Sequence, residues 1–228
     1  MSDRYFGKNL FGFLEDLKAN NTREWFQANK NRYVRDVKEP AQAFIADFAP
    51  HLAKVSPHFR SDPRPVGGSL FRINRDVRFS KDKSPYKTHA GLHFRHSAGK
   101  NAFTPGFYLH LEPRGCFAGV GLWHPDGPTL KKIRQRVAER PDAWKKAVED
   151  PAFARFYTVE GDRLKRPPRG FDPDHELVEI LKFKDFTGMS KLTQKQVIAT
   201  GFIEEFAELC RAGGSLVRFI CEALDQPY

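Results

Sequence analysis

The sequence predicts an α+β protein with N-terminal helices, a central and mainly antiparallel sheet that contains a β-hairpin, and C-terminal helices. Apolar residues recur at helical spacing up to about residue 55 and again after residue 128. Between these regions apolar and polar residues alternate, as in half-buried strands. Helices and strands that are segregated along a chain favour α+β over an alternating α/β sheet. We expect one domain over residues 1–228, because no change in composition marks a linker.

Three helices are expected in the first third of the chain. The first is predicted by apolar spacing and ends at Asn20-Asn21-Thr22, where Asn21 and Glu24 resemble a capping box with Asn21 as the cap. The second contains Trp25 and Tyr33, and the third begins at Pro40, since proline suits a first helical turn. The apolar positions that carry these predictions are Phe11, Leu14, Leu17, Phe26, Val37, Phe44, Ile45, Phe48 and Leu52.

Strands are expected after a connection over Ser56 to Gly68. Alternation predicts a strand from Phe71 to Phe79, a second around Leu92 to Phe94, and a hairpin formed by Phe107–Glu112 and Phe117–Trp123. A two-residue turn at Arg114-Gly115 would pair the polar face of the hairpin with glycines. That register places His110 opposite Gly119, Tyr108 opposite Gly121 and Glu112 opposite Phe117, which would leave a floor without side chains under part of the polar face.

The remaining residues read mainly as helices. Two helices are expected over Pro128–Arg140 and Pro141–Glu149, followed by a basic loop over Leu164–Asp174. A short helix at His175–Leu181 and an edge strand at Phe183–Phe186 come next. Two final helices follow, and Gly213-Gly214 separates them as a C-cap would.

Composition indicates a cytoplasmic protein. The 228 residues include 21 Phe and 3 Trp, enough for a sizeable core. No run approaches the roughly 18 apolar residues of a membrane helix, and the first residues do not resemble a secretory signal. The three cysteines, Cys116, Cys210 and Cys221, are odd in number and form no Cys-x-x-Cys pair, so we expect reduced thiols and no membrane partner. The sequence does not fix the oligomeric state.

Positive charge is concentrated in one part of the chain. Of the net charge of +10, residues 60–100 carry +7, from ten Lys and Arg against three Asp. A local positive field attracts phosphate-bearing ligands, nucleic acid or acidic partners. The alternative is an ordinary solvated basic surface.

The segment from Arg72 to Lys87 is therefore the candidate anion site. On an extended strand, Arg72, Asn74, Asp76 and Arg78 would share one face and lead into a lysine-bearing loop. Arginines on a strand suit bidentate capture of phosphate or carboxylate. The predicted ligand-binding residues are Arg72, Arg75, Arg78, Lys81, Lys83, Tyr86, Lys87 and Tyr108. The alternative is a salt-bridge network in which Asp76 and Asp82 neutralise part of this charge.

The same segment carries a family resemblance. Arg75-Asp-Val-Arg-Phe-Ser-Lys-Asp-Lys-Ser-Pro-Tyr-Lys87 resembles the signature of the family catalogued as domain of unknown function 2461. Further agreement spans nearly the whole chain: Phe13-Leu14 with Leu17, Asn20-Asn21 with Trp25-Phe26, Tyr33 and Pro40, Tyr108 to Pro113, Gly119 to Trp123 with Pro125, and Pro168 to Asp172. The resemblance implies a single intracellular α+β domain and supplies no catalytic residues.

Candidate catalytic residues are His110, Glu112 and Asp76, which could act as acid, base or metal ligand. His89, His93 and His96 have ligand-like spacing for a helix, but the alternation around them favours a strand, on which His96 leaves the shared face. His110 and Glu112 would complete a zinc or manganese site only if folding brought them to a histidine. We therefore assign no metal site and no cofactor from the sequence.

Three functions remain open. The first is a domain that binds a phosphate-bearing ligand, with nucleic acid as one candidate. The second is an enzyme that acts on a phosphorylated or other anionic substrate, with or without a metal ion. The third is an interaction domain that docks an acidic partner.

Overall fold

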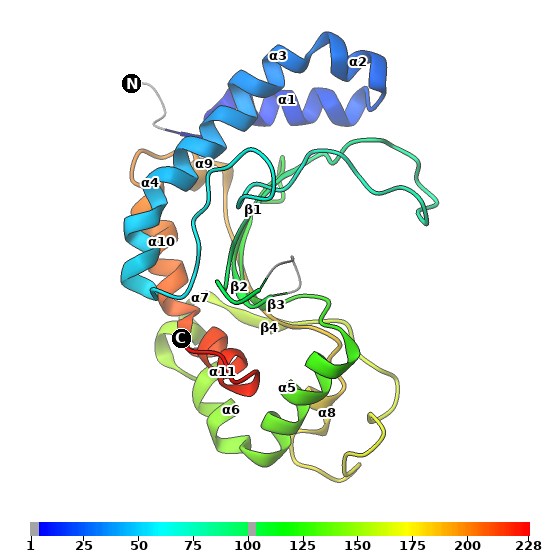
Figure 1. Ribbon diagram of the computed structural model, residues 1–228, viewed down its shortest axis with the longest axis vertical. Helices are drawn as coiled ribbons and strands as arrows, with labels where there is room; N and C mark the ends of the chain where they lie inside the picture. The colour runs from blue at the N-terminus through cyan, green and yellow to red at the C-terminus, as the bar shows by residue number, and fades with distance from the viewer. Residues whose placement is uncertain (1–4, 100–103) are drawn as a thin grey trace.

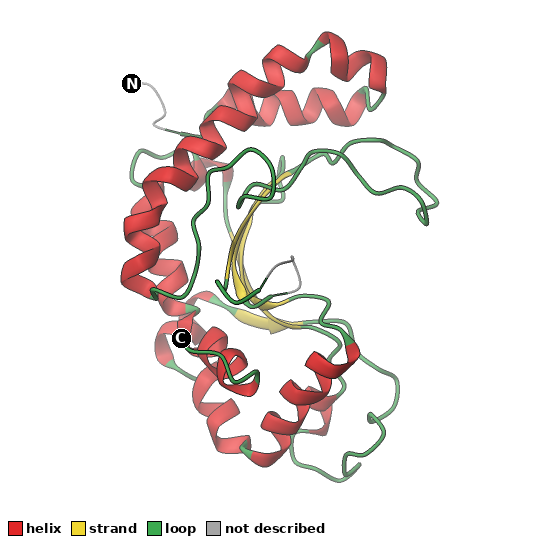
Figure 2. Ribbon diagram, viewed as in Figure 1, coloured by secondary structure: helices red, strands yellow, loops and turns green. Residues whose placement is uncertain are grey.

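The computed structural model describes residues 5–99 and 104–228, and it confirms an α+β fold (Figures 1 and 2). The N-terminal helical region consists of α1 (Lys8–Ala19), α2 (Arg23–Ala28), α3 (Lys30–Tyr33), the π-helical turn η1 (Val34–Lys38) and α4 (Glu39–Val55). The strands are β1 (Ala90–Arg95), β2 (Gly106–Leu111), β3 (Phe117–Leu122), β4 (Thr158–Glu160) and β5 (Phe186–Lys191). The other helices are α5 (Gly127–Glu139), α6 (Pro141–Val148), α7 (Pro151–Phe156), α8 (Val178–Leu181), α9 (Gln194–Val197), α10 (Phe202–Ala212) and α11 (Gly214–Ala223).

The strands form one antiparallel sheet in the order β1-β2-β3-β5-β4. The predicted strand around Leu92 and the predicted hairpin are confirmed as β1, β2 and β3. The predicted edge strand at Phe183–Phe186 is wrong. The strand begins where that prediction ends, at Phe186, and lies between β3 and β4, a position that requires pairing on both sides. The short strand β4, only three residues long, was not predicted.

One face of the sheet is apolar and packs against helices. Phe94 of β1 contacts Phe48 of α4 and Phe206 of α10, with ring centroids 4.8 and 5.7 Å apart. In Figure 1, α4 and α10 lie along the convex side of the curved sheet. The apolar residues of β1, β2 and β3 belong to one core cluster that also includes the inner faces of these helices. The opposite, concave face is therefore the one left open for polar side chains.

The N-terminal helices differ from expectation at their boundaries. Thr22, and not Asn21, caps α2, because the Thr22 side chain accepts the Trp25 N–H. Asn21 instead bonds the backbone of Tyr86, donating to its carbonyl at 2.9 Å and accepting its N–H at 3.1 Å. The predicted second and third helices are joined through η1, and Pro40 lies in the first turn of α4 as expected.

Residues 71–87 form a projecting arm, and the predicted strand from Phe71 to Phe79 is wrong. Alternation alone did not make a strand because the segment lacks a ladder partner; a single bridge joins Asn74 to Tyr86 near its base. Figure 1 shows the arm reaching out on the concave side of the sheet. The prediction that the apolar side chains of this segment pack on the core holds for Ile73, which is buried. It is wrong for Phe79, which is 96% exposed.

Other expectations concern location and domain organisation. Among the described helices, none has the length and apolar character needed to cross a bilayer. All three cysteines are buried free thiols. The first four residues, part of the segment judged unlike a secretory signal, lie outside the described residues. The single domain and the cytoplasmic location stay predictions.

Candidate functional site

The open face of the sheet carries a row of polar and aromatic side chains. The register places Gly91 beside His110, His93 beside Tyr108, and Tyr108 beside Gly119 on the next strand. All these positions point to the same side, because side chains alternate along a strand. The glycines leave room for the large side chains beside them, because a Cβ at Gly91 would meet the Tyr108 hydroxyl and one at Gly106 would meet the His93 imidazole.

Three potential metal ligands converge at one corner of this face. His89 precedes β1, His110 lies in β2, and Glu112 follows β2. Each offers one ligand atom, and the three atoms lie within 4.8 Å of one another, a grouping that no other set of three in residues 5–99 and 104–228 achieves. Donor atoms that share one ion lie within about 4.4 Å of each other, twice a usual bond to zinc. Only small side-chain movements would close this triad, His89, His110 and Glu112, around an ion.

Tyr108 fixes the orientation of His110. Its hydroxyl lies 3.1 Å from Nδ1 of His110, and Nε2 of His110 lies 3.3 Å from Glu112. A histidine that binds a metal through one nitrogen commonly uses the other for a supporting hydrogen bond. Gly91 makes this arrangement possible, because a Cβ at that position would lie 2.3 Å from the Tyr108 hydroxyl.

Both imidazoles of the triad are held neutral. Burial lowers the pKa of His89 to about 4, and the nearby His110 adds to the effect. Burial also lowers the pKa of His110, although the bond to Glu112 opposes the shift. A neutral imidazole keeps the lone pair that a metal ion needs. At neutral pH the triad consists of two such donors and a carboxylate.

The hairpin register differs from the prediction by two residues. The turn is centred on Pro113-Arg114, where the Gly115 N–H donates to the Glu112 carbonyl at 3.0 Å, so His110 pairs with Phe117 and Tyr108 with Gly119. Moving the centre of the turn by one residue shifts every pair by two. His110 stacks on Phe117 with centroids 4.5 Å apart, while the glycine floor lies under Tyr108. The predicted pairing of His110 with a glycine is therefore wrong, and the Phe117 ring supports His110 instead.

The base of the arm lies next to the triad. Phe71 packs near Tyr108 and His93, with centroid separations of 6.1 and 5.9 Å. The Lys87 ammonium lies 5.4 Å from the Phe71 ring centroid and donates to the Arg72 carbonyl at 2.8 Å. Burial and the nearby Arg72 lower the pKa of Lys87. The base of the arm thus places Lys87 close enough to His89 to affect its pKa, with Arg72 beside Lys87.

Most charged groups predicted to bind an anion are engaged within the arm. Arg75 pairs with Asp82, and Arg78 pairs with Asp76 at 2.6 Å. Lys83 donates to the Val77 carbonyl at 3.0 Å. In the part of the chain that the structure describes, the charged ends of Arg72 and Lys81 make no hydrogen bond or ion pair.

Two predicted site residues lie away from the others. Tyr86 is buried, and its ring stacks on Phe26 with centroids 4.1 Å apart, so its role is to anchor the arm. Asp76 is exposed and paired with Arg78, whose hydrogen bonds lower its pKa to about 2, and it takes no part in the triad. His96 also leaves the open face, since Nε2 lies 2.9 Å from the Pro227 carbonyl.

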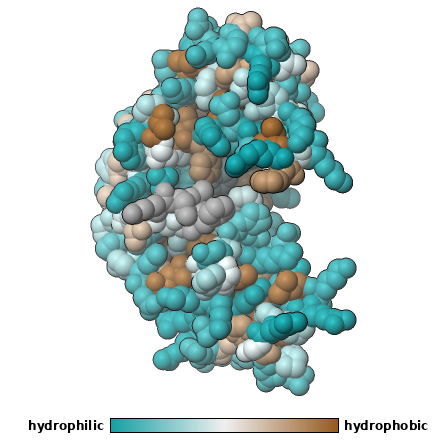
Figure 3. Space-filling model, turned by 45° about the vertical axis from the view of Figure 1, so that its right-hand side comes forward, coloured by the Kyte–Doolittle hydropathy of each residue, from teal (hydrophilic) through white to brown (hydrophobic). Residues whose placement is uncertain are grey.

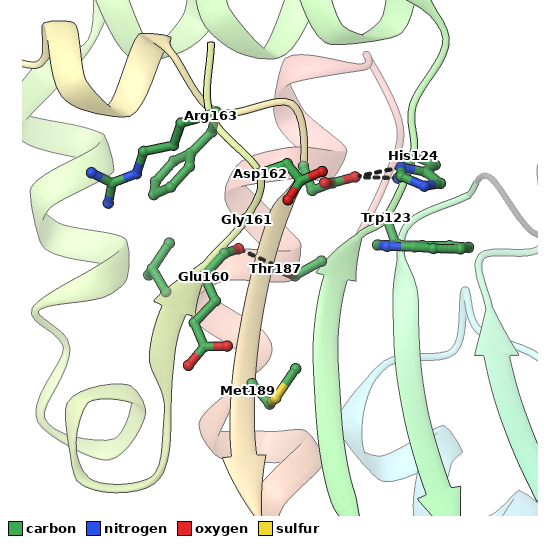
Figure 4. A pocket seen from close by; sticks show the side chains of 11 residues that line it. Trp123, His124, Glu160, Gly161, Asp162, Arg163, Thr187 and Met189 are labelled. Carbon is green, nitrogen blue, oxygen red and sulfur yellow. Dashed lines mark hydrogen bonds and ion pairs between the residues drawn. The ribbon is translucent and has the colours of Figure 1, made fainter. Parts of the chain in front are cut away.

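The far end of the sheet holds a second histidine–carboxylate pair (Figure 4). Asp185 accepts the backbone N–H of His124 at 2.6 Å, and Nδ1 of the same histidine lies 3.1 Å from Oδ1 of Asp185. His124 has a φ of 51°, in the left-handed region. The indole of Trp123 stacks on the imidazole with centroids 4.0 Å apart.

This pair borders an open cleft of about 650 Å³. The cleft also contains three further charged groups, Glu160, Asp162 and Arg163, and an apolar wall formed by Val159, Phe183 and Met189. Arg163 lies over Phe183, 4.5 Å from the ring centroid. Carboxylates outnumber cations here, so this end of the face differs in charge from the arm.

The sequence offered His89, His110 and Glu112 as a metal site only if folding joined them and assigned none, and it missed the His124–Asp185 pair. The first depends on the β1–β2 register, which brings residues 21 positions apart into contact. The second joins residues 61 positions apart, where no local spacing reveals contact. The turn-forming run from His124 to Pro128 directly after a strand was the available signal that β3 ends in a special backbone conformation.

Comparison with known proteins gives a family for the chain. The model of a family described as "Conserved hypothetical protein (DUF2461)" matches residues 9–219, which confirms the resemblance seen in the sequence. Neither the curated proteins nor the solved structures contain a match to the chain.

Proposed function

The chain belongs to the DUF2461 family, and we propose that it is a metal-dependent enzyme that hydrolyses a phosphate-bearing substrate. One observation supports this proposal above the others: the ligand atoms of His89, His110 and Glu112 lie within 4.8 Å of one another on the open sheet face. Two imidazoles and one carboxylate form a ligand set used by zinc hydrolases, which leave a further position for water or substrate.

The protonation states of the triad favour metal binding. Ordinary histidines lose part of their metal affinity as they take up protons near pH 6.5. Burial shifts this loss to lower pH, because the pKa of His89 is about 4 and that of His110 is also lowered. The hydroxyl of Tyr108 holds His110 with Nε2 toward Glu112. The donor atoms are therefore oriented before any ion arrives.

The reaction follows from the donor set and the adjacent cations. His89, His110 and Glu112 would hold a divalent ion, which would supply an activated water for attack on phosphorus. Hydrolysis would place the oxygen of that water on phosphorus and release the leaving oxygen with a proton from water. Lys87 and Arg72 lie at the base of the arm, where their charge would offset that of the phosphate.

Metal titration tests the proposal. After treatment with a chelator, the full chain is titrated with Zn²⁺ and Mn²⁺ by calorimetry. We expect one ion per chain, with affinity lowered more than 100-fold in His110→Ala, because one ligand of a zinc site supplies about 3 to 4 kcal/mol. The matched control is His51→Ala on α4, outside the triad, which should bind like the wild type.

Activity is measured on bis(p-nitrophenyl) phosphate as the probe. Hydrolysis should depend on the ion and disappear in His110→Ala. Equal behaviour of the two histidine variants, or absence of a bound ion, contradicts the proposal. Two histidines and a carboxylate also bind iron(II) in oxygenases. If the protein retains iron(II) and consumes oxygen, its activity is an oxygenation and the proposed hydrolysis is wrong.

A further inference from the structure

The arm, residues 71–87, differs from ordinary surface loops in its charge. It carries six cationic side chains against two aspartates, a net charge of +4. The aspartates are occupied by Arg75 and Arg78. Four cations have no carboxylate partner among the described residues: Arg72, Lys81, Lys83 and Lys87. Lys83 and Lys87 donate only to backbone carbonyls, so the charge of all four is uncompensated within the arm.

The tip of the arm presents an aromatic ring to solvent. Phe79 is 96% exposed, and the Arg78 guanidinium lies 5.9 Å from its ring centroid. Only Val66 and Trp123 are other large apolar side chains with comparable exposure among the described residues. Figure 3 shows a mostly hydrophilic surface on which hydrophobic side chains appear as separate spots. Single exposed apolar side chains are common on protein surfaces, so only the combination of this ring with the cations of the arm points to a ligand.

The base of the arm is fixed to the body of the protein. Asn21 makes two hydrogen bonds to the Tyr86 backbone, and Tyr86 stacks on Phe26. Lys87 and Phe71 at the same base lie beside Tyr108 and the triad. A ligand bound along the arm can therefore continue onto the open sheet face.

Stacking and charge together identify the ligand class. A row of cations binds phosphates, and an exposed aromatic ring stacks with a base that is not already stacked inside a duplex. An acidic peptide would satisfy the charges but offers no flat ring at regular intervals, and an anionic membrane would contact the tip without reaching the triad. Resting on the proposed function, we infer that the substrate is single-stranded nucleic acid, held by the arm and cleaved at the triad.

Binding is tested with the full chain in EDTA, which separates binding from cleavage. The probe is a fluorescent oligothymidylate of about 16 nucleotides, the upper site size of a single-strand binding fold. We expect the logarithm of Kd to rise with the logarithm of salt concentration with a slope of about 3, given four uncompensated cations. The double variant Arg72→Gln with Lys81→Gln should halve that slope, whereas Lys18→Gln with Lys54→Gln removes the same charge from the N-terminal helices and should leave the slope unchanged.

The aromatic contribution has its own matched pair. Phe79→Ala should weaken binding about 10-fold through loss of one stacked base. Trp123→Ala also removes an exposed ring, but from the cleft that contains Glu160 and Asp162, and should leave binding unchanged. Equal losses in both variants, or duplex bound as tightly as the single strand, overturn the inference. Capture of polyglutamate or of phosphatidylserine vesicles through Phe79, without oligonucleotide binding, overturns it in favour of an acidic protein or a membrane.

Cleavage distinguishes this inference from the proposed function. With the ion restored, the oligothymidylate should be cut by the wild type and remain intact with His110→Ala, which still binds it. If bis(p-nitrophenyl) phosphate is hydrolysed but the oligothymidylate is bound and not cut, the nucleic acid is no substrate and the metal-dependent activity stands. If no ion binds while the Phe79 dependence holds, the metal-dependent activity is refuted and the ligand class of the arm stands.

Discussion

Each end of the open sheet face pairs a histidine with a carboxylate, and the two pairs are buried in opposite ways. At the triad, the His110 side chain is 11% exposed and that of Glu112 is 29% exposed. At the cleft, the His124 side chain is 53% exposed whereas that of Asp185 is 5% exposed. The same two side-chain types therefore meet with the imidazole inside at one end and the carboxylate inside at the other.

The difference separates the proposed metal ligands from a pair that holds the backbone in place. A buried imidazole stays neutral and offers a lone pair, and a second histidine shares the site. A buried carboxylate instead needs donors, and Asp185 receives both from one residue, His124. These two hydrogen bonds hold the backbone of His124 in the left-handed region directly after β3. Three measurements test this distinction.

The largest expected effect is a fall in stability on acidification, centred on the triad end. Burial, with a smaller contribution from Arg95, lowers the pKa of His93 to about 4 from the ordinary 6.5. Below pH 6.5, His93 is protonated in the unfolded chain but stays neutral in the folded chain. The free energy of unfolding therefore falls as the pH is lowered to about 4. At 1.36 kcal/mol for each pH unit, the loss is about 3 kcal/mol for this residue.

Urea unfolding in EDTA between pH 7 and 4 measures this loss. His93→Gln should remove about 3 kcal/mol of the loss and leave the share of His89, whose pKa is also lowered to about 4, while Trp123→Phe, which keeps every histidine, should leave the dependence unchanged. A pH dependence of His93→Gln equal to that of the wild type would show that this buried imidazole is not the source. The comparison uses slopes, so a uniform loss of stability in the variant does not affect it.

The next effect concerns the cleft. Asp185→Ala removes the acceptor of two hydrogen bonds and leaves the His124 N–H without a partner, so we expect the free energy of unfolding to fall by about 2 kcal/mol. Metal affinity should not change. Asp162→Ala in the same cleft is the control and should stay within about 0.5 kcal/mol. A loss of metal binding in Asp185→Ala would mean that the two ends are coupled.

The smallest effect isolates the support of the triad. Gly91→Ala places a Cβ against the Tyr108 hydroxyl and displaces it from His110. We expect metal affinity to fall about 10-fold, at the lower end of what a lost supporting bond causes. Gly127→Ala meets no atom within 4 Å and serves as the control. Unchanged affinity in Gly91→Ala would show that Tyr108 does not orient the ligand.

The sequence predicted the fold where periodicity and pairing agree. Helical spacing located α1, α4, α5, α10 and α11, and alternation located β1, β2 and β3. Alternation at Phe71 to Phe79 gave a wrong strand, because a strand also needs a neighbour, and the arm has one bridge only. Strand β5 was predicted as an edge strand, but it lies between β3 and β4. Its inner position depends on two partners that are distant in the sequence.

The candidate site was predictable in part. His110, Glu112 and Tyr108 were identified from alternation within one strand, and the structure brings them together. The sequence could not place His89 beside them, because His89 reaches them only through the pairing of Ala90 with Leu111. Tyr86 was misplaced for a related reason. Its aromatic ring resembles a ligand platform in the sequence, whereas the fold supplies Phe26 as its partner.

The strand order has a consequence for the nascent chain. Strand β3 is complete at Leu122, but its second partner begins at Phe186, after all of α5 to α8 has been synthesised. At about 5 to 20 residues per second, a ribosome needs several seconds to supply that partner. During this interval the edge of β3 exposes unpaired N–H and C=O groups that another chain could pair with. We expect synthesis, more than the finished fold, to be the stage at which this protein aggregates and most needs a chaperone.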